Sequence, residues 1–173
     1  FSLQNQGYFT MCTYGDLFES GVPNTLQYMA LSYTRGITSI PTDYSQTAMY
    51  RLDLTCIPAL SGDITTYVFP STMSNIQIVG TNLCGNLENY PFTTGYTNVQ
   101  LRCSRFTGNL ANVRITGSSV YSVYLDSNCL SGNVADFCFS DAVTNLSLGC
   151  NSNVYLDLTS KTFDTKSLSS LYL

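Results

Sequence analysis

The stretch VYSVYLDSNCLSGNV, residues 120–134, decides the fold because its pattern recurs along the chain. It begins with apolar residues at Val120, Val123 and Leu125, in an apolar-x-x-apolar-x-apolar arrangement. The same arrangement begins at residues 26, 49, 73, 96, 120, 143 and 168, which are 23 to 25 residues apart. Self-similarity at a fixed period of this length is typical of solenoids. We therefore expect residues 1–173 to form a single repeat solenoid.

A second motif follows most of these starts: a large apolar residue, a small residue, glycine, any residue and an apolar residue. It reads LCGNL at 83–87, FTGNL at 106–110 and LSGNV at 130–134. In the second repeat LSGDI at 60–64 follows one inserted residue near Pro58, and the first repeat ends in Ile40-Pro41. Together the two motifs resemble the leucine-rich-repeat family, in its plant-like LxxLxLxxNxLSGxIP subtype, over essentially the whole chain.

Stacking explains why such repeats occur together. The alternate side chains of a short strand such as 123–125 face opposite ways, and one repeat cannot bury its apolar side alone. Copies stacked about 4.8 Å apart form one parallel β-sheet over a continuous core. The returning segments 64–70, 112–116 and 134–139 are short and poor in Ala, Glu and Lys. We expect them on the convex side as extended, 3₁₀ or loop structure, with little α-helix.

The ninth position of each repeat predicts how regular the strand ends are. It carries Thr34, Thr81, Ser104, Asn128 and Asn151. In leucine-rich repeats an asparagine there bonds to neighbouring backbone, which Thr and Ser do less well and Ile57 cannot do. We therefore expect the second repeat to be distorted near 56–60. The glycines at 62, 85, 108 and 132 are expected where the backbone needs a positive φ or a close approach.

The two ends are less regular. Residues 1–25 look like a degraded first repeat, with Leu3 lying 23 residues before Leu26 and Gly15-Asp16-Leu17 matching Gly-Asp-Ile at 62–64. The last strand pattern stops at Leu173, and neither end carries a recognisable polar cap. Three alternatives follow: the chain is cut from a longer solenoid, copies stack end to end, or the caps are unusual.

Composition argues against several function classes. The net charge is −4, only 10% of residues are charged, and the seven basic residues are scattered, so we expect neither nucleic-acid binding nor membrane insertion. The chain has no histidine, which removes Ser-His-Asp and Cys-His catalysis. It also lacks a CxxC motif and a glycine-rich phosphate loop, and Asp53 has no second acid beside it in its column. We expect no enzyme activity, no metal and no cofactor.

The outward side chains of the strands form the surface that binds ligands in this family. This face is polar, nearly neutral and rich in amides with some tyrosine, which suits a protein or glycan ligand. The alternative is that stacked Asn and Gln side chains only stabilise the sheet. The predicted face comprises Tyr28, Arg51, Asp53, Asn75, Gln77, Asn98, Gln100, Arg102, Ser122, Tyr124, Asp126 and Asn145.

Two further features concern modification. Asn145-Leu146-Ser147 is an N-x-[ST] sequon, so Asn145 could carry a glycan in a secreted eukaryotic protein. Cys56, Cys103 and Cys150 recur every 47 residues. Two repeats separate them by about 9.6 Å, beyond the ~7 Å reach of a disulfide, so they cannot pair with one another. We expect most of the seven cysteines to be free thiols or small core fillers, with pairing to another chain as the alternative.

These observations lead to two functional hypotheses. The first is a non-catalytic, extracellular or cell- or virion-surface module that binds a protein or glycan through the strand face. The second is a structural repeat protein of an extracellular fibre, or of a phage or cell-surface appendage, whose copies associate end to end.

Overall fold

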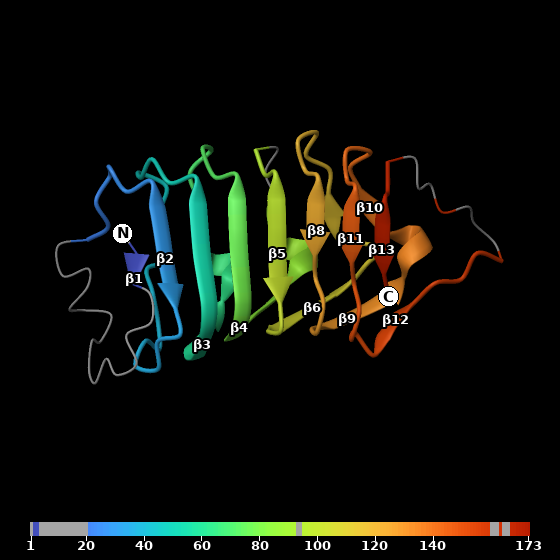
Figure 1. Cartoon of the computed structure of the whole chain (residues 1–173), viewed down its shortest axis with the longest axis horizontal. Coiled ribbons are helices and arrows are strands. Elements are labelled where there is room, and N and C mark those ends of the chain that lie inside the picture. The colour runs from blue at the N-terminus through green and yellow to red at the C-terminus, as the bar shows by residue number, and fades with distance from the viewer. Residues whose placement is uncertain (1, 4–20, 93–94, 160–162, 164–166) are drawn as a thin grey trace.

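The computed structural model describes residues 2–3, 21–92, 95–159, 163 and 167–173. The chain forms a parallel β-solenoid of about six turns. Figure 1 shows its strands standing side by side along the long axis, in the order in which they follow one another along the chain. In the part of the chain that is described, no residue lies in an α-helix, which agrees with the low helix content predicted.

The main sheet contains one strand from each repeat, and all its strands are parallel. Neighbouring strands are one repeat apart, so that Leu52 pairs with Ile76 and Ile76 with Val99. This register confirms the repeat spacing read from the sequence. The strands, in spatial order, are β1 (Ser2–Leu3), β2 (Tyr28–Ser32), β3 (Arg51–Asp63), β4 (Asn75–Asn86), β5 (Asn98–Arg102), β8 (Ser122–Tyr124), β11 (Asn145–Ser147) and β13 (Ser170–Tyr172).

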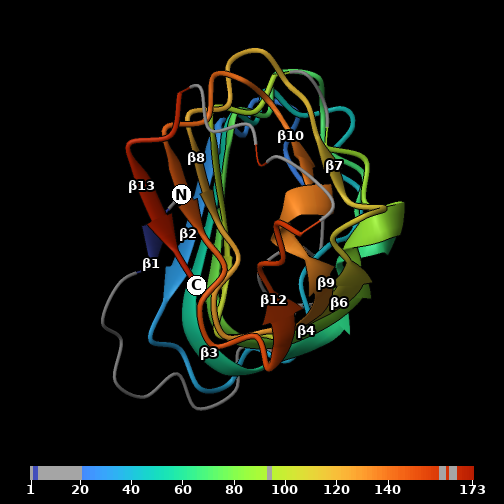
Figure 2. The same ribbon diagram turned by 90° about the vertical axis from the view of Figure 1, so that its right-hand side faces the viewer.

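The prediction of a single row of strands was incomplete, because β-sheet hydrogen bonding continues where the chain bends away from the main sheet. Strands β3 and β4 extend past this bend, and a second ladder of parallel strands forms beside the end of β4 (Figure 2). Its further strands are β6 (Arg105–Asn109), β9 (Cys129–Asn133) and β12 (Asn153–Tyr155). A separate pair, β7 (Arg114–Ile115) with β10 (Cys138–Phe139), lies on the return path. The solenoid therefore has β-structure on more than one side.

Short 3₁₀-helices follow the second ladder, as predicted for the convex side. In each, the residue before the helix accepts a hydrogen bond from the second backbone N–H, so Asp63, Asn86 and Asn133 act as N-caps. Two of these caps, Asp63 and Asn86, also explain a glycine of the next turn, Gly85 and Gly108 respectively. A Cβ on Gly85, whose φ is +143°, would lie 2.7 Å from Oδ1 of Asp63. The 3₁₀-helices are η1 (Ile64–Thr66), η2 (Leu87–Asn89) and η3 (Val134–Asp136).

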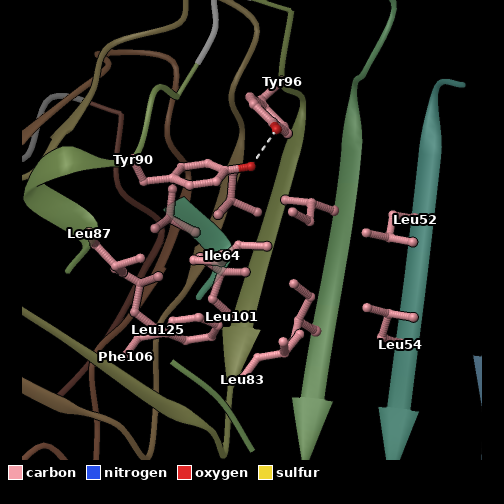
Figure 3. Packing of buried hydrophobic residues seen from close by; sticks show 14 of the residues in the cluster. Leu52, Leu54, Ile64, Leu83, Leu87, Tyr90, Tyr96, Leu101, Phe106 and Leu125 are labelled. Carbon is pink, nitrogen blue, oxygen red and sulfur yellow. Dashed lines mark hydrogen bonds between the residues drawn. The ribbon is translucent and has the colours of Figure 1, made fainter. Parts of the chain in front are cut away.

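The core lies between the main sheet and the return segments, and Figure 3 shows part of it. Its buried residues extend from Met29 to Leu148. Inward strand residues such as Leu52, Leu54 and Leu125 are fully buried. Two tyrosines in the core form a hydrogen bond with each other, with 2.8 Å between the hydroxyl oxygens of Tyr90 and Tyr96. Burial raises the pKa of Tyr96 to about 12, and burial followed by the proximity of Tyr96 raises the pKa of Tyr90. Both tyrosines are therefore neutral at physiological pH.

The expected distortion in the second repeat is confirmed. The register between β3 and β4 shifts between Ile57 and Ser61, so residues 58–60 bulge out of the ladder. Ile57 is fully buried, and it has no polar group with which to hold the turn.

The alignment of the first repeat was wrong by five residues. Leu3 pairs with Leu31, the third apolar position of its repeat, and not with the position of Leu26. The physical reason is that one repeat in this region has a different length, and a single apolar residue cannot fix a register. The Gly15-Asp16-Leu17 match lies outside the described residues. Among those that are described, no helix is long and apolar enough to cross a membrane.

The inward assignment of the strands can be tested by truncating Leu125, which is fully buried. We expect Leu125→Ala to lower the free energy of unfolding by about 2–5 kcal/mol, because it leaves a cavity in the core. The matched control is Leu158→Ala, since Leu158 is 53% exposed, and its effect should stay within about 0.5 kcal/mol. Urea denaturation measures both. A loss below about 1 kcal/mol at Leu125 would contradict the assignment.

Candidate functional site

The predicted ligand-binding residues do lie on one face of the main sheet. We call this surface the strand face. Residues that pair on adjacent strands form columns across this face. Tyr28 pairs with Arg51 in the first column, and Asp53 pairs with Gln77 in the second. The remaining pairs follow the predicted columns. They are Arg51 with Asn75, Asn75 with Asn98, Gln77 with Gln100, Asn98 with Ser122, Gln100 with Tyr124, and Ser122 with Asn145.

Access to this face is uneven. Ten of the twelve predicted residues are half-buried, but Asn98 and Ser122 are buried, with exposures of 9% and 5%. Both lie in the middle of the first column, between Asn75 and Asn145. They were predicted as ligand contacts, and the structure leaves them little surface with which to contact anything. The accessible polar surface lies on either side of them.

The first accessible cluster is centred on Arg51. Its guanidinium carbon lies 5.1 Å from the ring centroid of Tyr28, and Nη2 lies 3.4 Å from Oδ2 of Asp53. The other oxygen of Asp53 accepts hydrogen bonds from Thr55 at 2.8 Å and from Gln77 at 3.3 Å. The carboxylate is thus saturated by neighbours on two strands. It serves to position the arginine and the glutamine.

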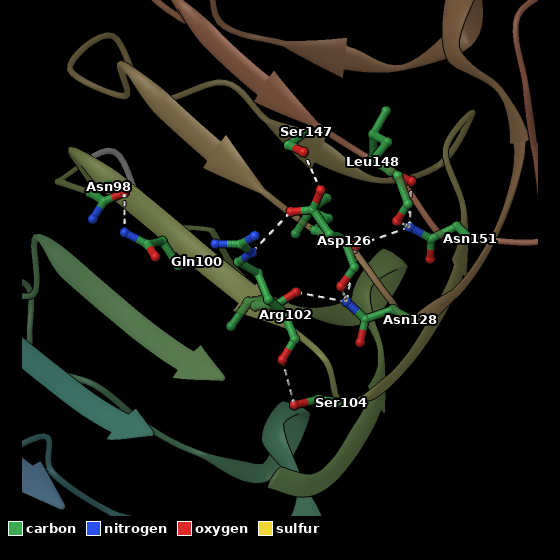
Figure 4. Close-up of polar contacts among 12 residues, drawn as sticks. Asn98, Gln100, Arg102, Ser104, Asp126, Asn128, Ser147, Leu148 and Asn151 are labelled. Carbon is green, nitrogen blue, oxygen red and sulfur yellow. Dashed lines mark hydrogen bonds and ion pairs between the residues drawn. The ribbon is translucent and has the colours of Figure 1, made fainter. Parts of the chain in front are cut away.

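A second cluster repeats this chemistry further along the solenoid (Figure 4). Nε of Arg102 lies 3.0 Å from Oδ2 of Asp126, and its guanidinium carbon lies 5.5 Å from the ring centroid of Tyr124. Ser147 donates a hydrogen bond to the other oxygen of Asp126. Each arginine is therefore stacked on a tyrosine and neutralised by an acid. Arginine–tyrosine stacking across strands was missed from the sequence, although the columns place Tyr28 beside Arg51.

Amides occupy the surface between the two clusters, and their contacts with one another are long. Asn98 donates to Asn75 at 3.4 Å, and Gln100 donates to Asn98 at 3.5 Å. Hydrogen bonds of this kind are usually 2.7–3.2 Å in length, so ~3.5 Å marks a weak one. These amides do not form a tight ladder. Asn75 and Gln100, which are half-buried, retain hydrogen-bonding capacity for another molecule, whereas Asn98 is buried.

The asparagines at the strand ends are different. Nδ2 of Asn128 donates to the carbonyls of Leu101 and Leu125 at 2.7 and 3.0 Å, while Oδ1 accepts from the backbone N–H of Phe106 at 3.2 Å. Asn151 repeats the pattern one turn later, with Nδ2 2.7 Å from the Leu148 carbonyl oxygen. Both are buried. These two asparagines form the predicted ladder and are structural residues.

A row of left-handed residues precedes this ladder. We call it the turn row, and its conformation does not follow from the sequence pattern. Positive φ angles of 49–67° occur at Tyr33, Cys56, Gly80, Cys103, Ser127 and Cys150. The backbone N–H of Tyr33, Cys103 and Ser127 each donates to a carbonyl of the next turn, at 2.8–3.0 Å. A non-glycine residue in this region costs about 1–2 kcal/mol, so the stacked turn must compensate for it.

Hydroxyl groups form another row, at the strand starts. Ser74, Thr97, Thr144 and Ser169 each donate to a backbone carbonyl of the preceding turn, at 3.0–3.1 Å. The sequence signal for this row was available, because a Ser or Thr occurs immediately before the outward column in four repeats. Its role is to anchor one turn to the next.

The predicted glycosylation site, the cysteines and the possible metal ligands lie as follows. Asn145 is half-buried in β11, and its Nδ2, the atom that a glycan would modify, donates to Thr144 at 2.9 Å and to Ser122 at 3.3 Å. Glycosylation of Asn145 therefore stays a prediction. The six cysteines within the described ranges are free thiols, and Cys12 lies outside them. No group of three His, Cys, Asp or Glu side chains that could hold a metal ion occurs among the described residues.

Comparisons with known proteins do not narrow the function. No protein-family model matches the chain, and no curated protein matches it. The resemblance to leucine-rich repeats therefore rests on the sequence motifs alone.

The distinction between the two kinds of asparagine leads to a test. We expect Asn128→Ala to lower the free energy of unfolding by about 1–3 kcal/mol, because it leaves buried backbone groups without partners. Asn145→Ala is the control, and its effect should stay within about 0.5 kcal/mol since Asn145 bonds only to neighbouring hydroxyls. Chemical denaturation compares the two. Equal effects would show that the strand-face amides are also structural.

Proposed function

We propose that this protein is a non-catalytic recognition module that binds a polar, uncharged protein or glycan surface through the strand face. The observation that carries the proposal is the contrast between its amides. The asparagines at the strand ends are saturated by short bonds to backbone, whereas those of the strand face contact one another at 3.4–3.5 Å. A surface whose hydrogen-bonding groups are only partly used favours a ligand that supplies the missing partners.

The two arginine clusters indicate what kind of ligand fits. Arg51 lies against Tyr28 and Arg102 against Tyr124, so each cluster offers a flat surface of a guanidinium and a ring. Each arginine also has an acidic partner, which leaves the face without a strong field. Charged ligands would gain little there. Hydroxyl and amide groups, together with the apolar faces of sugar rings, suit such a surface best.

The family and the location are part of the same proposal. The LxxLxLxxNxLSGxIP-like repeats support a plant-like leucine-rich-repeat protein, a family that uses the strand face for binding. An extracellular or cell- or virion-surface location fits a face rich in hydroxyl and amide groups. A chain with 10% charged residues and no histidine supports a role without catalysis.

Binding through the strand face can be tested on panels of immobilised glycans and proteins, followed by calorimetry on any hit. We expect Tyr124→Ala to weaken binding about tenfold, since losing a stacked ring costs about 1.4 kcal/mol. Gln100→Ala should weaken it as well. Tyr155→Ala is the matched control, because Tyr155 is 57% exposed on β12, away from the strand face. An equal loss in the control would show that binding occurs elsewhere.

A structural role is the alternative, and one observation favours it. Large apolar residues are exposed at the C-terminal end of the solenoid, where β13 pairs with β11 and with no other described strand. Such a cluster would be covered if copies stacked end to end, as the strands of a sheet stack. The exposed residues are Tyr155, Leu156, Leu158, Tyr172 and Leu173.

Electron microscopy of the purified protein separates this alternative from the first proposal. If copies stack end to end, long uniform filaments should form and Tyr172→Lys should abolish them, because it puts a charge on the stacking end. Tyr50→Lys, at an exposed tyrosine away from that end, should leave them intact. Discrete particles at all concentrations would rule out the structural role.

A further inference from the structure

The turn row carries cysteine at every second position. Cys56 lies within β3, Cys103 follows β5 and Cys150 follows β11. The strand order β3-β4-β5-β8-β11 leaves one strand between successive cysteines. They are therefore about 9.6 Å apart, which exceeds the ~7 Å between Cα atoms that a disulfide can span. No two of these thiols can pair within one chain.

The backbone at these positions does not favour cysteine. Cys56, Cys103 and Cys150 have φ angles of 54°, 49° and 57°, a region that suits glycine and asparagine. Gly80 occupies the same row and shows that the turn accepts glycine. Three cysteines in an unfavourable conformation therefore indicate that the side chain itself is used, since strained residues persist where they have a function.

The thiols are also accessible. Cys103 and Cys150 are exposed, and Cys56 is half-buried. The row lies where the chain leaves the strand face and bends toward β6 and β9 (Figure 2). A Cβ built on Gly80 would lie 3.7 Å from Sγ of Cys56, so that thiol lies along the row and not in the core.

We propose that two copies of this chain join side by side along the turn row through disulfide bonds. Equal spacing makes the row self-complementary, as a two-fold interface requires. A two-fold axis at Cys103 places that residue against its own counterpart in the second copy. It also places Cys56 of each copy against Cys150 of the other, so the half-buried thiol meets an exposed one.

The chemistry needs an oxidant, and a low-molecular-weight disulfide such as glutathione disulfide supplies it. The Cys103 thiolate attacks one sulfur of that disulfide, forming a mixed disulfide and releasing one thiol. The Cys103 thiolate of the second copy then attacks the protein sulfur, and the second small thiol leaves. Two protein thiols are oxidised to one disulfide and one small disulfide is reduced to two thiols. An extracellular location, where disulfides persist, provides these conditions.

The experiment compares three proteins incubated with glutathione disulfide and then analysed by non-reducing electrophoresis and light scattering. They are the wild-type chain, the row variant Cys56→Ser/Cys103→Ser/Cys150→Ser, and the control variant Cys84→Ser/Cys129→Ser/Cys138→Ser. The control removes the same number of thiols, all of them exposed and outside the turn row. Both variants keep Cys12. Serine is suitable because Ser127 already occupies the row with a φ of 55°.

We expect the wild-type and control chains to become dimers that dithiothreitol returns to monomers, while the row variant stays monomeric. Peptide mapping of the wild-type dimer should find Cys103 linked to Cys103 and Cys56 linked to Cys150. This mapping does not depend on whether the row variant folds. A wild-type chain that stays monomeric, a row variant that still dimerises, a control variant that does not, or links through other cysteines would each overturn the proposal.

Discussion

The strands of the main sheet end in a similar turn, because the parallel ladders before and after the bend have to stay in register from one repeat to the next. In this turn, which we call the corner, a residue with positive φ is followed by a polar side chain. That side chain bonds to backbone groups that have no partner in either ladder. Asn128 does this most completely, since it bonds to the carbonyls of Leu101 and Leu125 and to the N–H of Phe106. Where Ile57 takes this place, three residues leave the ladder. The position of the second ladder depends on this corner.

Because the corner, the core and the hydroxyl row hold the turns together, the side chains of the strand face are not needed to stabilise the stack. Its side chains differ from repeat to repeat, while the inward positions stay apolar. The two arginine clusters show this freedom. Arg51 lies in the first outward column and Arg102 in the third, yet both stack on a tyrosine and pair with an acid. A surface that varies over an invariant scaffold is the usual setting for recognition.

From residue 28 onward the sequence predicted the main-sheet strands and their register, together with the return segments and the irregularity at Ile57, because these follow from the repeat pattern. It did not predict the second ladder. Strand β6 contains Gly108, and glycine is unfavourable in strands, so propensity gave no signal there. Pairing also matches Gly85 with Phe106 and not with the equivalent glycine, so the second ladder is staggered relative to the motif. Periodicity alone could not show this.

The sequence predicted which residues point outward on the strand face, but not which of them are exposed. Alternation placed Asn98 and Ser122 outward correctly, but their exposure also depends on the side chains of the neighbouring strands, which no single repeat encodes. Stacking of arginine on tyrosine escaped prediction for the same reason, since it joins residues of adjacent strands with particular side-chain conformations.

The glycine beneath the cap of the preceding turn constrains how such a chain can change over time. Asp63 caps η1, and its carboxylate occupies the space that a side chain at residue 85 would need. Residues 63 and 85 belong to neighbouring repeats and are therefore constrained together. The same constraint joins Asn86 to Gly108, so a repeat can replace another only where the repeat before it leaves room for its residue at this position.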